Sequence, residues 1–380
     1  SILYNIIKSE KKQELKDMNV KKLQLINFRN YESETFSYSD GVNVVSGGNA
    51  QGKTNSAEAI FYLCAGYSPR AGRDKQVIRK GQDKASVEGV AEAAYGSVKV
   101  NIDFYSDNAK DVRVNDVKIA RSGELLGNIN SVFFNPSELR LIQDAPEDRR
   151  RFMDVSLSQL SRPYYYALQR YKKILSQRNA LLKDENRELV LDTLPIWDES
   201  LVKYGAKIVY ERNAFIERLS PLCEEAYSDI VGGAENIKIE GEEKFSGEED
   251  EIAVALKNAL SERAERDIEL GYTSIGPHRD DLKIKVDGTD VKVYGSQGQQ
   301  RTAAIALKLA ETEIFKERYG EYPVLILDDA MSELDRKRRE RLIGRVKKMQ
   351  TIITCTEPDC VPGYDNFNNI YIENGKIIKE

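Results

Sequence analysis

A chain of 380 residues, 41% of them hydrophobic and 31% charged, is long enough for two domains, and its composition excludes a disordered or fibrous protein. No run of eighteen apolar residues occurs and residues 1–17 lack a signal-peptide core, so we expect a cytoplasmic protein without a membrane partner. The four cysteines lack CxxC spacing, which argues against a zinc site or a disulfide framework. At a net charge of −5, any nucleic acid must bind to a local basic surface.

The first part of the chain predicts strands around one helix. Residues 1–17 carry little pattern, and we interpret them as an extension outside the fold. Apolar alternation in residues 20–38 predicts a pair of strands, and the apolar run 42–45 predicts another. Alternation in residues 98–119, with a turn at 115–116, predicts antiparallel strands that flank a nucleotide-binding domain.

A glycine-rich loop follows the strand at 42–45 and precedes a helix with apolar residues at helical spacing between 57 and 64. This order is typical of a P-loop, in which backbone N–H groups surround phosphate oxygens at a helix N-terminus. We expect Lys53 to contact the β- and γ-phosphates of ATP, and Thr54 to ligate Mg²⁺. The loop consists of Gly47, Gly48, Asn49, Ala50, Gln51, Gly52, Lys53 and Thr54.

Long helices are predicted from Pro146 onward. Leu168, Leu175 and Leu182 recur every seven residues, which favours an antiparallel helical hairpin. The glutamate-rich stretch 240–251 predicts a solvated loop before a further helix at about 251–265.

Strand patterns return near the C-terminus, with alternation at 282–286 and hairpin turns at 287–288 and 374–375. The fold class that we predict is α/β, with a P-loop ATPase head and a helical insertion. The changes of pattern divide the chain into an N-terminal half of the head, the insertion and a C-terminal half of the head, at 18–140, 141–270 and 271–380.

The apolar run 324–327 is typical of a buried parallel strand and ends in two aspartates, which is the Walker B pattern. In isolation, such a pair is more often a turn or a helix cap. Together with a P-loop, it predicts that Asp328 binds Mg²⁺ and that Asp329 polarises the water that attacks the γ-phosphate.

Residues 296–301 stand at the start of another predicted helix, and a helix N-terminus of this kind binds anions or is simply capped. In the presence of the other motifs, the stretch resembles the signature motif of ATP-binding-cassette ATPases. The resemblance implies that this motif contacts, in trans, the ATP held by a second copy of the chain. It also implies a dimer seam at Ser332 and Asp335, and ATP contacts in trans from Ser296, Gln297, Gly298 and Gln299.

Within that superfamily the chain resembles the RecF family of bacterial recombination and gap-repair proteins, through residues 26–31, 145–154, 276–281 and 296–301. The resemblance implies a head like that of SMC proteins, and a nucleotide contact from Arg29 or Asn30. It implies an ATP-dependent homodimer on double-stranded or gapped DNA, with RecR as a partner and RecA loading as the outcome. An SMC-like DNA scaffold, a transporter subunit, a small-molecule kinase and another cassette ATPase without a repair role are the alternatives.

The chain departs from many cassette ATPases in two places. Residues 134–138 lack the Q-loop glutamine, and residues 354–356 lack the switch histidine, so we expect slow hydrolysis. The single histidine, His278, follows Gly-Pro in a turn, and we assign it no catalytic role.

A basic stretch with interleaved tyrosines lies in residues 145–180 and is suited to phosphate contacts and stacking. A solvated helix face is an equally good interpretation of this pattern. The candidates for DNA contact are Arg149, Arg150, Arg151, Arg170, Lys172 and Lys173.

Overall fold

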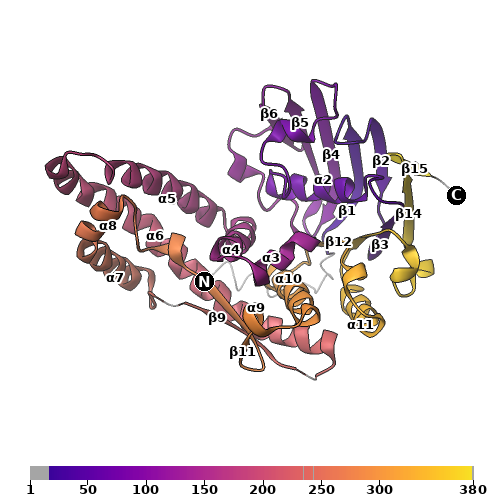
Figure 1. The fold of residues 1–380 in the computed structure, drawn as a ribbon. Helices are drawn as coiled ribbons and strands as arrows, with labels where there is room; N and C mark the ends of the chain where they lie inside the picture. The colour runs from indigo at the N-terminus through magenta and orange to yellow at the C-terminus, as the bar shows by residue number, and fades with distance from the viewer. Residues whose placement is uncertain (1–16, 234, 243, 379–380) are drawn as a thin grey trace, which may run out of the picture.

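The computed structural model describes residues 17–233, 235–242 and 244–378, so the predicted extension lies, apart from Asp17, outside the described residues. Figure 1 shows a body that contains two sheets, from which a helical arm projects. In the described part of the chain, no helix combines the length and the apolar character that a membrane crossing needs.

A mostly parallel sheet forms the centre of the body, in the order β15-β14-β3-β13-β12-β8. Only β15 runs antiparallel to its neighbour. The strand after which the P-loop comes therefore lies next to strands from the far end of the chain. Their bounds are β3 (Val42–Ser46), β8 (Ser131–Phe134), β12 (Val324–Asp328), β13 (Thr351–Cys355), β14 (Asn368–Glu373) and β15 (Lys376–Ile378).

An antiparallel sheet covers one side of the body, in the order β2-β1-β4-β5-β6-β7. Asn115 and Asp116 both have positive φ, 49° and 65°, which confirms the predicted tight turn between β6 and β7. The predicted flanking strands are thus confirmed. Their bounds are β1 (Asn19–Ile26), β2 (Ser33–Ser37), β4 (Lys84–Ala93), β5 (Gly96–Tyr105), β6 (Lys110–Val114) and β7 (Val117–Lys118).

Helix α2 (Lys53–Ala65) lies between the two sheets and is buried along most of its length. Gly89 on β4 permits this close packing, because a Cβ there would lie 2.3 Å from Leu63 Cδ1. The helix is therefore held on both sides, which fixes its N-terminus beside the end of β3.

The helical arm consists of α5 (Arg162–Leu181), α6 (Arg187–Val231), α7 (Glu249–Glu262) and α8 (Ala264–Leu270). Helices α5 and α6 run antiparallel and are joined by five residues, which confirms the predicted hairpin (Figure 1). Helix α4 (Pro146–Leu160) connects the arm to the body.

A third sheet shortens the loop that was predicted at 240–251, whereas the helix predicted after it, at about 251–265, is confirmed by α7. Strand β9 (Ile237–Gly241) extends into that stretch, and α7 begins at Glu249. Strand β9 pairs antiparallel with β10 (Leu282–Val286), and β10 also pairs antiparallel with β11 (Thr289–Asp290). This pairing joins segments that lie far apart in the chain. The local pattern, which is rich in glutamate, therefore predicted a loop and not a strand.

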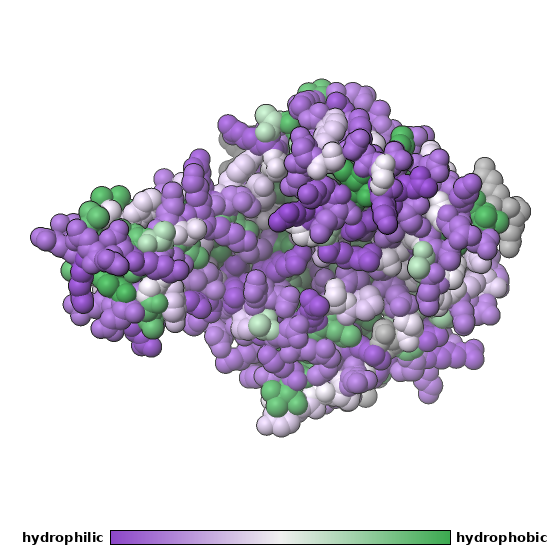
Figure 2. Space-filling model, turned by 45° about the horizontal axis from the view of Figure 1, so that its top comes forward, coloured by the Kyte–Doolittle hydropathy of each residue, from purple (hydrophilic) through white to green (hydrophobic). Residues whose placement is uncertain are grey.

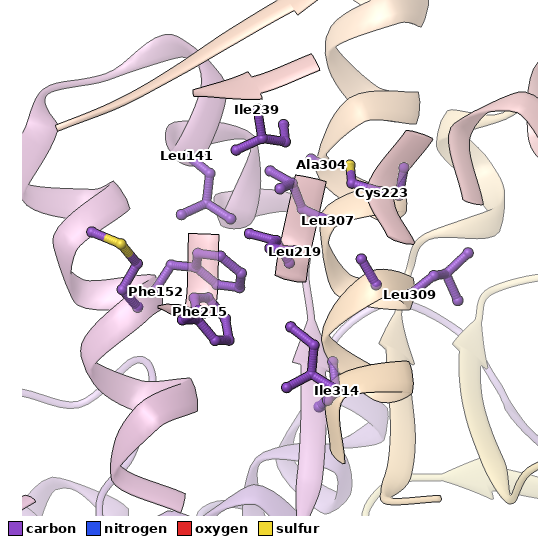
Figure 3. Close-up of a cluster of buried hydrophobic side chains, with 14 of the residues drawn as sticks. Leu141, Phe152, Phe215, Leu219, Cys223, Ile239, Ala304, Leu307, Leu309 and Ile314 are labelled. Carbon is purple, nitrogen blue, oxygen red and sulfur yellow. The ribbon is translucent and has the colours of Figure 1, made fainter. Parts of the chain in front are cut away.

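One hydrophobic core surrounds α2 between the two sheets. A second core lies on the opposite face of the parallel sheet, where α10 (Gln297–Tyr319) packs against α6. Figure 3 shows Phe152 of α4, Phe215 and Leu219 of α6 and Leu307 of α10 converging there. One continuous cluster thus joins the body to the helices, so the domain boundaries at 140 and 270 stay a prediction. Short helices α3 (Arg140–Gln143) and α9 (Val291–Tyr294) and helix α11 (Arg336–Val346) complete this side.

Candidate nucleotide site

The P-loop connects β3 to α2 through a backbone that only certain residues can adopt. Gly47 and Gly52 have φ values of 147° and 120°, and Ala50 has 62°. A Cβ on Gly47 would lie 2.2 Å from the carbonyl oxygen of Ile372, and one on Gly52 would lie 2.7 Å from Tyr31 Oη. These two glycines therefore permit both the positive φ values and the close approach of Ile372 on β14 and of Tyr31.

Lys53 points back into the loop. Its Nζ donates hydrogen bonds to the carbonyl oxygens of Gly47 and Gly48, both at 2.7 Å. Burial lowers the pKa of the Lys53 ammonium. The side chain thus lies over the concave side of the loop, where a phosphate would meet it.

The two motifs predicted to bind Mg²⁺ meet directly, although 274 positions separate them in the chain. Thr54 Oγ1 donates to Asp328 Oδ1 at 2.9 Å, and Thr354 Oγ1 donates to the same oxygen at 2.6 Å. Burial raises the pKa of Asp328, while both hydroxyls and the charge of Arg70 act in the opposite direction. A hydroxyl and a carboxylate at this distance are a donor set that suits Mg²⁺.

Asp329 follows at the carboxyl end of β12, in the left-handed region with φ 54°. Its backbone N–H donates to Thr354, both to the carbonyl oxygen and to Oγ1, at 3.2 and 3.1 Å. The backbone of this residue is therefore held on β13, the strand between β12 and β3.

Of the two residues proposed for nucleotide contact in the first strand pair, the structure favours Asn30. Asn30 Nδ2 donates to the carbonyl oxygen of Gln51 in the loop, at 2.8 Å. The guanidinium of Arg29 is instead bound by the buried carboxylate of Glu58, with Nε and Nη2 donating at 2.9 and 2.6 Å. Arg29 therefore anchors α2 rather than facing the loop.

Two residues near the site were not singled out from the sequence. Thr354, in the stretch that lacks the switch histidine, binds Asp328, which only the pairing of β12 with β13 reveals. Arg70, in the segment after α2, donates to Asn55 Oδ1 at 3.3 Å and lies close enough to lower the pKa of Asp328. An arginine soon after a P-loop helix was the available signal.

The predicted signature stands at the start of α10. Ser296 Oγ accepts from the Gln299 N–H at 3.2 Å, and Gln299 Oε1 accepts from the Ser296 N–H at 2.9 Å. The stretch is thus a capping box, and Ser296 and Gln297 are exposed. A Cβ on Gly298 would lie 2.9 Å from Arg338 Nη1, so this glycine permits the contact with α11.

The two seam candidates lie between β12 and α11. Ser332 Oγ donates to the carbonyl oxygen of Asp329 at 2.8 Å, which connects it to the end of the Walker B strand. Asp335 accepts from the Arg338 N–H at 3.0 Å and caps α11. Both residues are exposed, as a contact with a second copy requires.

His278 has a structural environment. Its Nδ1 lies 2.7 Å from Tyr171 Oη, and its Nε2 lies 3.0 Å from the carbonyl oxygen of Thr273. Burial lowers the pKa of His278 to about 4. Both ring nitrogens are engaged, which agrees with the interpretation of a turn residue.

The basic stretch contains a wrong candidate. Arg149 is buried, and its guanidinium donates to both carboxylate oxygens of Asp281, at 2.6 and 2.9 Å. DNA contact through Arg149 is therefore excluded, because its guanidinium group is buried and already paired with a carboxylate inside the protein. Tyr164 and Tyr171 are buried as well. The candidates that remain at the surface are Arg150, Arg151, Arg170, Lys172 and Lys173.

A P-loop and a buried aspartate strand, with an exposed signature-like helix start, define the ATPase head of the ATP-binding-cassette class. Residues 19–379 match the RecF/RecN/SMC N terminal domain family, and the chain belongs to that family. Within it, the chain is similar to the DNA replication and repair protein RecF of Alkaliphilus oremlandii, with 42% identity over 89% of this chain and 93% of the relative. The RecF of Clostridium botulinum is 39% identical, over 95% of this chain and 99% of the relative.

Solved structures agree with this assignment. A structure of RecF with ATPrS, described as a recombination mediator of the RecFOR pathway, has a TM-score of 0.87 at 35% identity and covers 96% of this chain and 98% of its own. The Smc head domain derived from Pyrococcus furiosus has a TM-score of 0.56 at 19% identity, with coverage of 95% and 96%, and shows the shared fold alone.

Proposed function

We propose that this protein binds DNA in an ATP-dependent manner during replication and repair. ATP pairs two heads on DNA, and slow hydrolysis releases them. The observation that carries the proposal is the hydrogen bond between Thr54 and Asp328, which assembles the two halves of a nucleotide site from opposite ends of the chain.

Each motif has a role in this scheme. The loop from Gly47 to Thr54 surrounds the phosphates, and Lys53 exchanges its two backbone carbonyl partners for phosphate oxygens. Thr54 and Asp328 would hold Mg²⁺, which, when bound, neutralises charge on the β- and γ-phosphates. Asp329 orients and polarises the attacking water.

The second copy completes the site. The exposed start of α10, with Ser296, Gln297, Gly298 and Gln299, contacts the γ-phosphate held by the partner's P-loop, and the N–H groups there favour an anion. Ser332 and Asp335 lie along the same seam. Support comes from the similarity of the whole chain to an ATP-bound RecF structure.

The names of the relatives support a role with DNA. RecF proteins are described as DNA replication and repair proteins and as part of the RecFOR pathway, so we propose RecR and RecO as partners and RecA loading as the outcome. Bacterial chromosomal DNA lies in the cytoplasm, and we place the protein there. Duplex or gapped DNA is the substrate, held by surface cations whose contacts release counterions.

The test uses Asp329→Asn, which keeps the ATP contacts but removes the carboxylate that polarises water. We expect ATP to convert this variant from monomer to a persistent dimer in light scattering, with turnover reduced at least about 100-fold. Asp250→Asn, an exposed change on α7, is the control and should leave both quantities unchanged. A monomer with and without ATP would contradict the dimer, and unchanged turnover would contradict the role of Asp329.

A further inference from the structure

A cavity of about 630 Å³ lies where the arm meets the body, between α4, α5 and the end of α2. Figure 2 shows the surface hollowed between the projecting arm and the body. Its volume lies within the range of about 300–1,000 Å³ that is typical of small-ligand sites. A duplex cannot enter such a space, whereas a single nucleotide can.

The cavity is positively charged, although the protein as a whole is acidic. Two carboxylates line it against five cationic side chains, which are Lys110, Arg150, Arg151, Lys172 and Arg212. Asp154 is already neutralised, because it accepts from Arg212 at 2.8 Å and lies 3.4 Å from Lys172. Arg212 is also paired with Asp280, and Lys110 with Asp74, so Arg150 and Arg151 are the two lining cations without an ion pair in the described residues. The excess of cations is therefore suited to a phosphate.

Arg150 and Arg151 supply this excess. Arg150 donates to a backbone carbonyl, that of Asp280, at 2.8 Å, and burial together with the charge of Arg212 lowers its pKa. Arg151 is exposed at the rim, close to Tyr67. Within the described residues, neither guanidinium forms a hydrogen bond or ion pair with a carboxylate, although Asp280, Asp281 and Glu147 act on Arg150 electrostatically. Both guanidinium groups can therefore still donate to a phosphate.

Aromatic and polar groups complete the lining. Tyr165, half-buried on α5, borders the cavity, and its ring is held by an edge contact with Tyr166 at 5.4 Å. Gln159 and Gln169 add amide groups. Cations beside an aromatic ring are the combination with which proteins hold unpaired nucleotides.

We propose that this cavity holds one unpaired nucleotide of a DNA strand, so that the protein binds gapped DNA more tightly than continuous duplex. The inference rests on the proposed DNA binding. An unpaired nucleotide enters without the loss of a base pair, whereas a nucleotide within a duplex would have to be unpaired and unstacked first. The cavity thus discriminates between the two forms of DNA.

The position of the cavity connects it to the ATP site. Ala65, Gly66 and Tyr67, at the carboxyl end of α2, form part of the lining, and the P-loop lies at the other end of that helix. Lys110 Nζ donates to the carbonyl oxygen of Gly66 at 2.6 Å, which offsets the negative end of the helix where a phosphate would lie.

The test compares affinities of the full-length protein with ATP and Mg²⁺ for continuous duplex, gapped duplex and single-stranded DNA, by fluorescence anisotropy. We expect the wild type to prefer gapped DNA. Arg151→Ala with Lys172→Ala should remove that preference, and Tyr165→Ala should weaken gapped binding about 5- to 100-fold. A 2-aminopurine at the gap should lose its changed fluorescence in these variants.

The matched control comes from neighbouring side chains outside the cavity. Arg170→Ala with Lys173→Ala removes two exposed cations from the same helix, neither of which lines the cavity. This variant should weaken binding to all DNA forms equally and keep the gap preference. ATP-dependent dimerisation and thermal stability of every variant report on folding.

Each other outcome is decisive. Equal wild-type affinity for gapped and continuous duplex overturns the cavity inference but leaves the proposed DNA function intact. Loss of the gap preference in the control variant also overturns it. Absence of binding to every DNA form would contradict the proposed function itself.

Discussion

The parallel sheet and the helical arm differ in how well the sequence predicts the positions of their charged side chains. Beside the sheet, Lys53 at the start of α2 hydrogen-bonds to its own loop, and Asp328 at the end of β12 meets Thr54. In and beside the arm, Arg149, Arg178 and Arg212 are buried in ion pairs with distant aspartates. A motif therefore predicts side-chain position where the backbone geometry is local, whereas a basic stretch does not predict exposure.

The largest effect that tests this comparison is expected at Arg178, which lies in the basic stretch 145–180. It donates to Asp267 at 2.8 Å and to Asp198 at 2.6 Å, and it is fully buried. Arg178→Ala leaves two carboxylates without their partner and should lower the free energy of unfolding by about 3–5 kcal/mol. Urea denaturation measures this. Lys173→Ala, exposed on the same helix, should change it by less than about 0.5 kcal/mol, and equal effects would contradict the burial.

The P-loop offers a sharper test within the sheet region. Gly52→Ala places a methyl group at φ 120° and against Tyr31, and should cost about 1–3 kcal/mol together with most ATP affinity. Gly48→Ala is the matched control for stability, because its Cβ would meet only Gln51, at 3.6 Å. Titration with a fluorescent ATP analogue and urea denaturation separate the two variants. Similar losses of stability in both would show that the loop geometry does not depend on Gly52.

A pH dependence is expected from the single histidine of the chain, at the junction of arm and body. The folded pKa of His278, about 4, lies below its ordinary value near 6.5, so the unfolded state binds a proton that the native state does not. Stability should therefore fall as the pH falls through this window, by about 1–2 kcal/mol between pH 6.5 and 5. His278→Gln should remove this part of the slope. NMR of the one imidazole gives the direct measurement, and titration near pH 6.5 would contradict the buried position.

The sequence by itself determined the nucleotide motifs, the strand and helix on either side of the P-loop, and the helical hairpin. These follow from short-range physics: apolar periodicity, glycines that allow positive φ at Gly47 and Gly52, and turns at residues 115–116 and 374–375. Each signal lies within a few residues of the element that it predicts.

Only the tertiary structure decided which charges are free, and which distant segments pair. Strand β9 forms by pairing with β10, and Thr354 contacts Asp328 because β12 pairs with β13. Arg149 can be buried because the fold brings Asp281 next to its guanidinium group. These contacts join residues that lie far apart in the chain, and their energy depends on burial, which no local pattern specifies.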